Sequence, residues 1–206
     1  GSLRGIYIHR KENLDARNVL RLRRTFLKQL GGFKSRVKHL LYNNGIMIPD
    51  CFSRPGTHWS RSFMKWLRED VVLLSSTRTS LDMLLDTVEL LRKNLLSVTR
   101  QIRFLSRSER YAKDFENLMS IPGIGLLVGM CLLTEIDDVR RFRNEKQFAS
   151  YLGLVPMSHS SGEKICNGEK TFRGNKLLGL MLVESAWVTI QHDSIMAAAY
   201  GEYCKR

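Results

Sequence analysis

The sequence predicts a mainly α protein, in which a long helical coiled-coil hairpin is followed by a compact helical domain with a helix-hairpin-helix motif. Three observations lead to this fold class. Residues 13–43 space their apolar side chains as a helix does, residues 74–105 carry a heptad repeat, and residues 118–125 place a glycine-containing turn between apolar segments. Because such periodicities gather apolar side chains on one face of a helix, each segment needs a surface to pack against.

The charge of the chain is concentrated in its first half. Of the net charge of +13, residues 1–110 contribute all, with 22 Lys and Arg against 9 Asp and Glu, whereas residues 111–206 are balanced at 11 and 11. Such a basic region indicates a nucleic acid or another anionic partner. We therefore expect a domain boundary at this point, with residues 1–110 serving oligomerisation and nucleic-acid binding and residues 111–206 forming a second domain.

Composition argues against two other classes of protein. No run of about 18 apolar residues occurs, so we expect no membrane partner. The cysteines are scattered at Cys51, Cys131, Cys166 and Cys204, without the clustering that a zinc site needs. We expect reduced thiols of a cytosolic protein, with no metal site and no cofactor in this chain.

The helix expected over residues 13–43 carries a basic ridge. Its members recur at i, i+4, i+7 and i+11, namely Arg17, Arg21, Arg24 and Lys28. A solvated helix face is one interpretation of this pattern. We favour contact with phosphates, because few acids in this region offset the charge.

The heptad repeat is the clearest structural signal in the chain. One apolar row recurs every seven residues at Leu74, Leu81, Val88, Leu95 and Ile102. A second row follows three residues later at Leu84, Leu91, Val98 and Leu105. This seam fits an antiparallel hairpin with residues 13–43 or a pairing with a second chain, and we expect both, as a dimer or tetramer. In the intervening loop, Phe52, Trp59 and Phe63 either dock on the core, which we favour, or stack on bases.

The turn at Ile121-Pro-Gly-Ile-Gly125 fits a helix-hairpin-helix. Gly123 and Gly125 would permit a tight turn whose N–H groups meet a DNA phosphate, and Gly129 would let the two helices approach closely. A plain helical turn is the alternative. The acids that follow, Glu135, Asp137 and Asp138, are interpreted as a solvated helix end rather than a metal site.

Residues 153–162 are expected to form a flexible loop that contains Ser160 and Ser161. An activated serine in such a loop can attack phosphorus, although most Ser-Ser-Gly loops have no such role. Basic residues that could stabilise an attacked phosphate follow at Lys164, Lys170, Arg173 and Lys176. The apolar run 179–199 is then expected to be a buried closing helix, which residues 196–200 either continue or follow as a short terminal helix.

Several of these motifs occur together in an order that resembles a known family. They are Leu118-x-x-Ile-Pro-Gly-Ile-Gly, Glu135-Ile-x-Asp-x-x-Arg-Phe142, Phe148-Ala-Ser-Tyr-Leu-Gly-Leu-Val-Pro156, Ser161-Gly162 and Gly174-Asn175. Over roughly residues 115–190 the chain resembles the C-terminal domain of IS110-type insertion-sequence transposases, which are related to pilin-gene-inverting and bridge-RNA-guided recombinases. The resemblance implies Ser161 as the nucleophile, with Ser160 as the near alternative, and a coiled coil for assembly.

The resemblance also implies an N-terminal RuvC-like domain whose acidic residues bind Mg²⁺. We expect the chain to begin past that domain, and therefore to bind DNA but to be inactive alone. The family pattern R-x-L-R is reduced here to Lys176-Leu-Leu-Gly179.

Three functions remain open at this point: part of a DNA transposase in the bacterial cytoplasm, associated with the nucleoid; a non-catalytic nucleic-acid-binding and oligomerisation module; and a structural helical protein. A structured guide RNA is a further partner that the resemblance leaves open.

Overall fold

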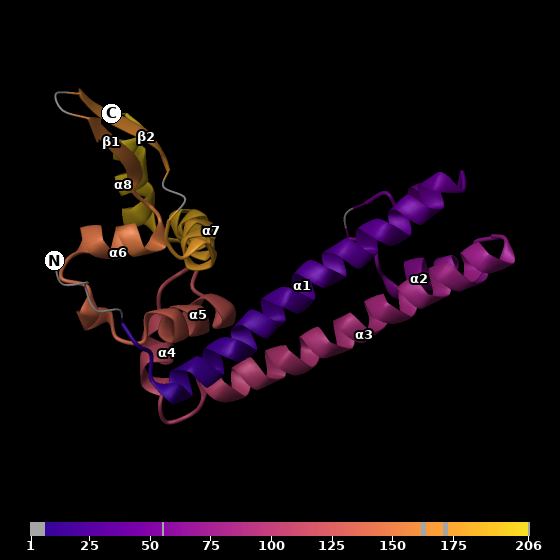
Figure 1. Ribbon diagram of the computed structural model, residues 1–206, viewed down its shortest axis with the longest axis horizontal. Helices are drawn as coiled ribbons and strands as arrows, with labels where there is room; N and C mark the ends of the chain where they lie inside the picture. The colour runs from indigo at the N-terminus through magenta and orange to yellow at the C-terminus, as the bar shows by residue number, and fades with distance from the viewer. Residues whose placement is uncertain (1–6, 55, 162–163, 171–172, 206) are drawn as a thin grey trace. The chain divides into compact units, whose positions relative to one another are not determined.

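The computed structural model describes residues 7–54, 56–161, 164–170 and 173–205, and the side chains of residues 157–170 lie outside the description. The expected mainly α fold is confirmed (Figure 1). No helix in the described ranges is both long and apolar enough to span a bilayer. The chain divides into two compact units, which we call the helix-pair unit (residues 21–100) and the C-terminal unit (residues 1–20 and 101–206).

This division differs from the boundary expected between residues 110 and 111. The start of the first helix belongs to the C-terminal unit, because its side chains bond to residues far along the chain. Asn13 Nδ2 donates to the carbonyl oxygen of Thr134 at 2.7 Å, and Tyr111 OH donates to Asn13 Oδ1 at 2.9 Å. Net charge along the sequence does not report such contacts.

The helix-pair unit consists of the later part of α1 (Lys11–Asn43), η1 (Asp50–Phe52), α2 (Arg61–Glu69) and most of α3 (Ser75–Ser106). Within it, α1 and α3 run antiparallel side by side (Figure 1), and Arg23 Nε donates to Thr99 Oγ1 at 3.0 Å. Their core is built by buried apolar side chains of both helices, including Leu30, Val37, Leu41, Leu81, Leu85, Val88 and Leu91. The apolar periodicities therefore meet within one chain.

One heptad position does not follow the expected pattern. Leu74 is 85% exposed, because α3 begins only at Ser75. The aromatic side chains of the connecting loop dock on the core, as favoured above: the Phe63 ring lies 5.1 Å from that of Phe52 and 5.4 Å from that of Trp59. Ser60 caps α2 by accepting a hydrogen bond from the Phe63 N–H.

The C-terminal unit contains short helices and a two-stranded sheet. Its elements are α4 (Ala112–Met119), α5 (Leu126–Ile136), η2 (Val139–Arg141), α6 (Glu145–Leu152), β1 (Pro156–Ser161), β2 (Lys164–Lys170), α7 (Lys176–His192) and α8 (Ser194–Tyr203). Cys131, Leu132, Leu152 and Leu178 form a small core between them. Asn144 and Asn175 cap α6 and α7 by accepting hydrogen bonds from Gln147 N–H and Leu178 N–H.

The serine segment is a β-hairpin, where a loop was expected. Strands β1 and β2 pair antiparallel, with His159 opposite Cys166 and Ser161 opposite Lys164. Residues 162 and 163, between the strands, lie outside the described residues. The prediction of a loop was wrong because it rested on the polar composition of the segment. Strands pair through backbone hydrogen bonds, which do not require apolar residues.

The expectation that the closing segment is buried is also wrong, whereas the alternative of a separate short terminal helix is confirmed. Asp193 ends α7 and caps α8 by accepting hydrogen bonds from the N–H groups of Ile195 and Met196. Many apolar side chains here are exposed, with Trp187 at 53% and Ile195 at 77%. Only one face of α7 is buried, around Leu178 and Thr189.

Candidate functional site

The turn between α4 and α5 is fixed against α7. Gly123 has φ +88°, and a Cβ on it would overlap the Ser185 carbonyl oxygen. Thr189 Oγ1 donates to the Pro122 carbonyl at 2.6 Å, which holds the turn on α7. Gly129 would place a Cβ 3.1 Å from the Phe115 ring, so it allows the close approach of α4 and α5 that the sequence predicted.

A buried carboxylate lies at the end of α5. Glu135 is 2% exposed, and its Oε2 lies 2.7 Å from Arg17 Nη2 and 2.9 Å from Asn175 Nδ2. The interaction with Glu135 raises the pKa of Arg17. The interpretation of Glu135 as part of a solvated helix end was wrong, because partners from distant segments cover it.

The main-chain carbonyl of Glu135 is bound as well. It accepts hydrogen bonds from Tyr151 OH at 2.8 Å and from Arg141 Nη2 at 3.5 Å. The Arg141 guanidinium also lies 4.4, 4.6 and 4.7 Å from the ring centroids of Tyr7, Phe142 and Tyr151. Within the described part of the chain, Arg17 Nε and Arg141 Nε are buried without a hydrogen-bond partner.

A second carboxylate, that of Asp137, lies two residues after Glu135. Its residue adopts φ +64°, and its side chain accepts hydrogen bonds from Tyr7 OH at 2.8 Å and Arg110 Nη2 at 3.1 Å. Burial, followed by the hydrogen bond with Asp137, raises the pKa of Tyr7. This carboxylate is committed to structural partners.

The β-hairpin is held at its base by the same network. The Asn175 N–H donates to the Tyr151 carbonyl at 2.7 Å, and a Cβ on Gly174 would lie 2.6 Å from the Gly153 nitrogen. We call the close approach of Gly153 and Gly174 the clamp. It lies at the base of the hairpin, because Gly153 precedes β1 and Gly174 follows β2. Glu135 thus connects α5 and Arg17 to both ends of the segment that carries the serines.

The expected site residues fall into four groups: the hairpin residues, the two basic residues that follow the hairpin, the basic ridge and the glycines of the α4–α5 turn. The backbones of Ser160 and Ser161 lie in β1, and those of Lys164 and Lys170 lie in β2, but all four side chains are outside the described residues. Arg173 and Lys176 are exposed beside the clamp at Gly174 and Asn175.

The basic ridge is divided between the two units. Arg17 is engaged with Glu135 in the C-terminal unit, whereas Arg21, Arg24 and Lys28 are exposed on α1 in the helix-pair unit.

Of the turn glycines, Gly123 packs against α7, whereas Gly125 has open space around its Cα and is the N-cap residue of α5. Sequence reasoning missed the roles of Glu135 and Asn175, although both stand in the quoted motifs.

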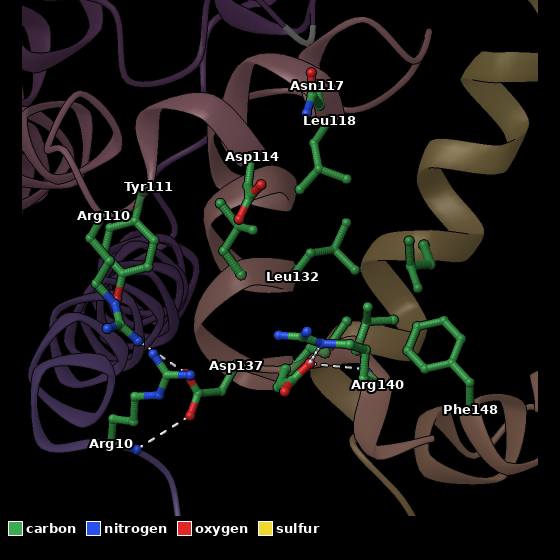
Figure 2. Close-up of a pocket in the computed structure, with 15 residues that line it drawn as sticks. Arg10, Arg110, Tyr111, Asp114, Asn117, Leu118, Leu132, Asp137, Arg140 and Phe148 are labelled. Carbon is green, nitrogen blue, oxygen red and sulfur yellow. Dashed lines mark hydrogen bonds and ion pairs between the residues drawn. The ribbon is translucent and has the colours of Figure 1, made fainter. Parts of the chain in front are cut away.

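A cavity of about 770 Å³ opens in the C-terminal unit, with α4 and α5 on its walls (Figure 2). Leu118, Leu132 and Phe148 provide apolar lining. Four of its charged residues pair with one another, since Arg110 binds Asp137 and Arg140 binds Asp138. Across the residues that the structure describes, no three His, Cys, Asp or Glu side chains gather in a group that could hold a metal ion.

Comparison with known proteins finds a family model and several relatives that match the chain. Residues 115–201 match the model of the transposase IS116/IS110/IS902 family. The chain is 23% identical over 189 residues to the transposase for insertion sequence element IS1111A of Coxiella burnetii, covering 88% of this chain and 48% of the relative. It is 25% identical over 187 residues to the putative transposase y4qE of Sinorhizobium fredii, covering 91% and 43%. The mini-circle putative transposase for IS117 of Streptomyces coelicolor is 39% identical over 66 residues, covering 32% and 16%.

The relatives named above are transposases or putative transposases, among them those of the insertion sequences IS1111A and IS117. The match of residues 115–201 to the IS116/IS110/IS902 family model, together with these relatives, confirms the resemblance to the C-terminal part of an IS110-type transposase. The chain spans about half the length of the first two relatives. Glu135, Arg141, Tyr151 and Asn175 all lie within the matched range.

Proposed function

We propose that the chain is the DNA-binding and assembly part of a transposase that mobilises an insertion sequence, and that it supplies a serine nucleophile for strand exchange. The observation that carries this proposal is the match of residues 115–201 to the transposase family. It spans both the clamp at Gly153 and Gly174 and the serine strand β1. A buried, hydrogen-bonded clamp supports the rigid placement that a nucleophile needs.

In the proposed reaction the Ser161 oxygen attacks a DNA phosphorus atom. A serine–phosphate bond forms, the bond from phosphorus to one sugar oxygen breaks, and that oxygen leaves with a proton as the serine hydroxyl loses one. The phosphodiester bond energy is kept in the adduct, so a second sugar hydroxyl can reverse the step and join a new strand. Lys164, Lys170, Arg173 and Lys176 would stabilise the negative charge that develops on the phosphate.

Mg²⁺ belongs in this proposal to an acidic RuvC-like domain of the whole transposase. Glu135 and Asp137 do not fit such a site, because Glu135 is paired with Arg17 and Asp137 with Arg110. The proposed partners are DNA, a structured guide RNA and further copies of the chain, and the place of action is the nucleoid in the bacterial cytoplasm.

The test for the nucleophile is a covalent adduct on a denaturing gel. The chain would be joined to the implied RuvC-like domain and incubated with Mg²⁺ and cognate DNA ends. We expect an adduct that Ser161→Ala abolishes and Ser160→Ala retains. An adduct that survives both substitutions, or cleavage without any adduct, would assign the chemistry to the acidic domain.

The second candidate function is a non-catalytic nucleic-acid-binding and oligomerisation module. It is favoured by the charge of residues 1–110 and by the exposed ridge at Arg21, Arg24 and Lys28. Replacing these three residues with Gln should weaken DNA binding and lower the slope of log affinity against log salt by up to about 2.7, at 0.9 for each phosphate contact. Unchanged affinity would remove the ridge from both candidate functions.

A further inference from the structure

A cluster of cations surrounds the loop that precedes α2 in the helix-pair unit. Lys38 Nζ lies 3.3 Å from His58 Nδ1, and Lys34 Nζ lies 5.3 Å from the centroid of the Trp59 ring. From α3, Arg92 Nη1 donates to the Trp59 carbonyl at 3.0 Å. Cations from two segments far apart in the sequence, α1 and α3, therefore meet at the loop that carries Trp59.

In the part of the chain that the structure describes, no acid pairs with these cations. Among the described residues, no carboxylate lies within ion-pair distance of Lys34, Lys38 or Arg92, and the nearby acids of α3, Asp86 and Glu89, pair with Arg68. Residues 16–68 contain 12 Lys and Arg but a single acid, Asp50. Burial, and then the neighbouring charges of Arg92 and Lys38, lowers the pKa of Lys34. Cations held together against their repulsion favour an anion as the missing partner.

An open groove of about 790 Å³ adjoins the cluster and shares Lys38 with it. On its wall, Tyr42 stands one helical turn beyond Lys38 and is 79% exposed, and Met47 is 87% exposed. Ile46 and Ile48, half-buried, complete an apolar surface beside the ring. Base stacking uses an exposed aromatic ring of this kind next to backbone-binding cations.

We propose that this end of the helix-pair unit binds a single nucleic-acid strand, with phosphates at Lys34, Lys38 and Arg92 and an unpaired base stacked on Tyr42. The inference rests on the proposed nucleic-acid function and adds a site separate from the ridge and from the serine hairpin. Trp59 supports it: this buried residue adopts φ +65°, and such backbone strain is frequent at ligand clamps. A duplex would keep its bases paired and away from Tyr42, so the site should prefer a single strand.

The experiment measures fluorescence anisotropy of labelled 12-nucleotide dT and rU strands, an abasic strand and a 12-base-pair duplex with the 206-residue chain. We expect Tyr42→Ala to weaken strand binding about tenfold, since stacking contributes about 1–3 kcal/mol per base. Tyr42→Phe should stay within about twofold of the parent, and the abasic strand should not respond to Tyr42→Ala. Tighter binding of dT or of rU identifies DNA or RNA as the strand.

Lys38→Gln should lower the salt slope by about 0.7, the value for one phosphate contact on a single strand. Lys93→Gln is the matched control, because Lys93 is exposed on α3 one position past Arg92 and lies outside the cluster contacts. Equal effects of the two lysine substitutions, or no effect of Tyr42→Ala on dT and rU, would overturn this site. If the variant with Gln at Arg21, Arg24 and Lys28 still lost DNA binding, the proposed function would stand without the single-strand site. A parent chain that binds no nucleic acid would refute both.

Discussion

Arg17 Nη2 lies 2.7 Å from Glu135 Oε2, and this contact joins the first turns of α1 to the end of α5. The Arg17 side chain is 20% exposed and the Glu135 side chain 3%, so the pair is largely shielded from solvent. Asn175 shares the same carboxylate oxygen and caps α7. One carboxylate therefore links three segments of the C-terminal unit, and removing its counter-ion should affect the whole unit.

Replacing Arg17 with Met should destabilise the C-terminal unit by about 3 kcal/mol, because it leaves a buried carboxylate without its cation. Urea unfolding followed by circular dichroism measures the change. The double variant Arg17→Met/Glu135→Leu should lose less than the single variants combined, since neither charge is then left alone. Arg24→Met, an exposed change on the same helix, is the control. Equal losses in Arg17→Met and Arg24→Met would contradict the structural role of the pair.

The two glycines of the α4–α5 turn should respond differently to alanine. Gly123→Ala forces a Cβ against the Ser185 carbonyl at a positive φ, so we expect a loss of about 2 kcal/mol in the free energy of unfolding. Gly125→Ala meets no atom within 4 Å and should stay within about 0.5 kcal/mol of the parent. Similar thermal midpoints for the two variants would show that the turn does not pack on α7 in this way.

The stability of the C-terminal unit should fall below neutral pH through His9. Burial, followed by the charges of Arg17 and Arg141, lowers the pKa of His9 from its ordinary value of 6.5 and outweighs the opposing effect of Asp137. Because the unfolded chain then takes up the proton more readily, the stabilising contribution is present above pH 6.5 and is lost as the pH falls through the folded pKa. His9→Gln should reduce the decline in urea midpoint between pH 7 and 5. His39→Gln, at an exposed position, should keep the parent profile, and a steeper decline in His9→Gln would reverse the assigned sign.

Assembly, if it uses α3, should depend on the apolar side chains that the helix pair leaves uncovered. Met83 and Leu90 stand seven residues apart and are 66% and 57% exposed. Met83→Gln/Leu90→Gln should shift the chain toward the monomer in light scattering after size-exclusion chromatography, because the apolar area available to a second copy falls. Thr79→Gln, also exposed on α3, serves as the control. Oligomers that persist in the double variant would place the contact elsewhere.

The sequence by itself determined the two long helices and the resemblance to a transposase family. Apolar spacing of 3.6 and 7 residues predicted α1 and α3 and their pairing, because these periodicities come from helix geometry. The motifs from Leu118 to Asn175 identified the transposase domain, since they are local and ordered. Net charge located the basic half for the same reason: it is a property of composition.

Only the tertiary structure decided which polar residues are buried and which segments form one unit. Nothing near Glu135 in the sequence indicated Arg17, more than a hundred residues away, or Asn175, and an acid without a visible partner was interpreted as solvated. The β-hairpin of the serine segment depends on backbone pairing and on the clamp between Gly153 and Gly174, which side-chain patterning does not encode. The cation cluster around Trp59 likewise needs three separate segments to meet, so only the fold could bring it together.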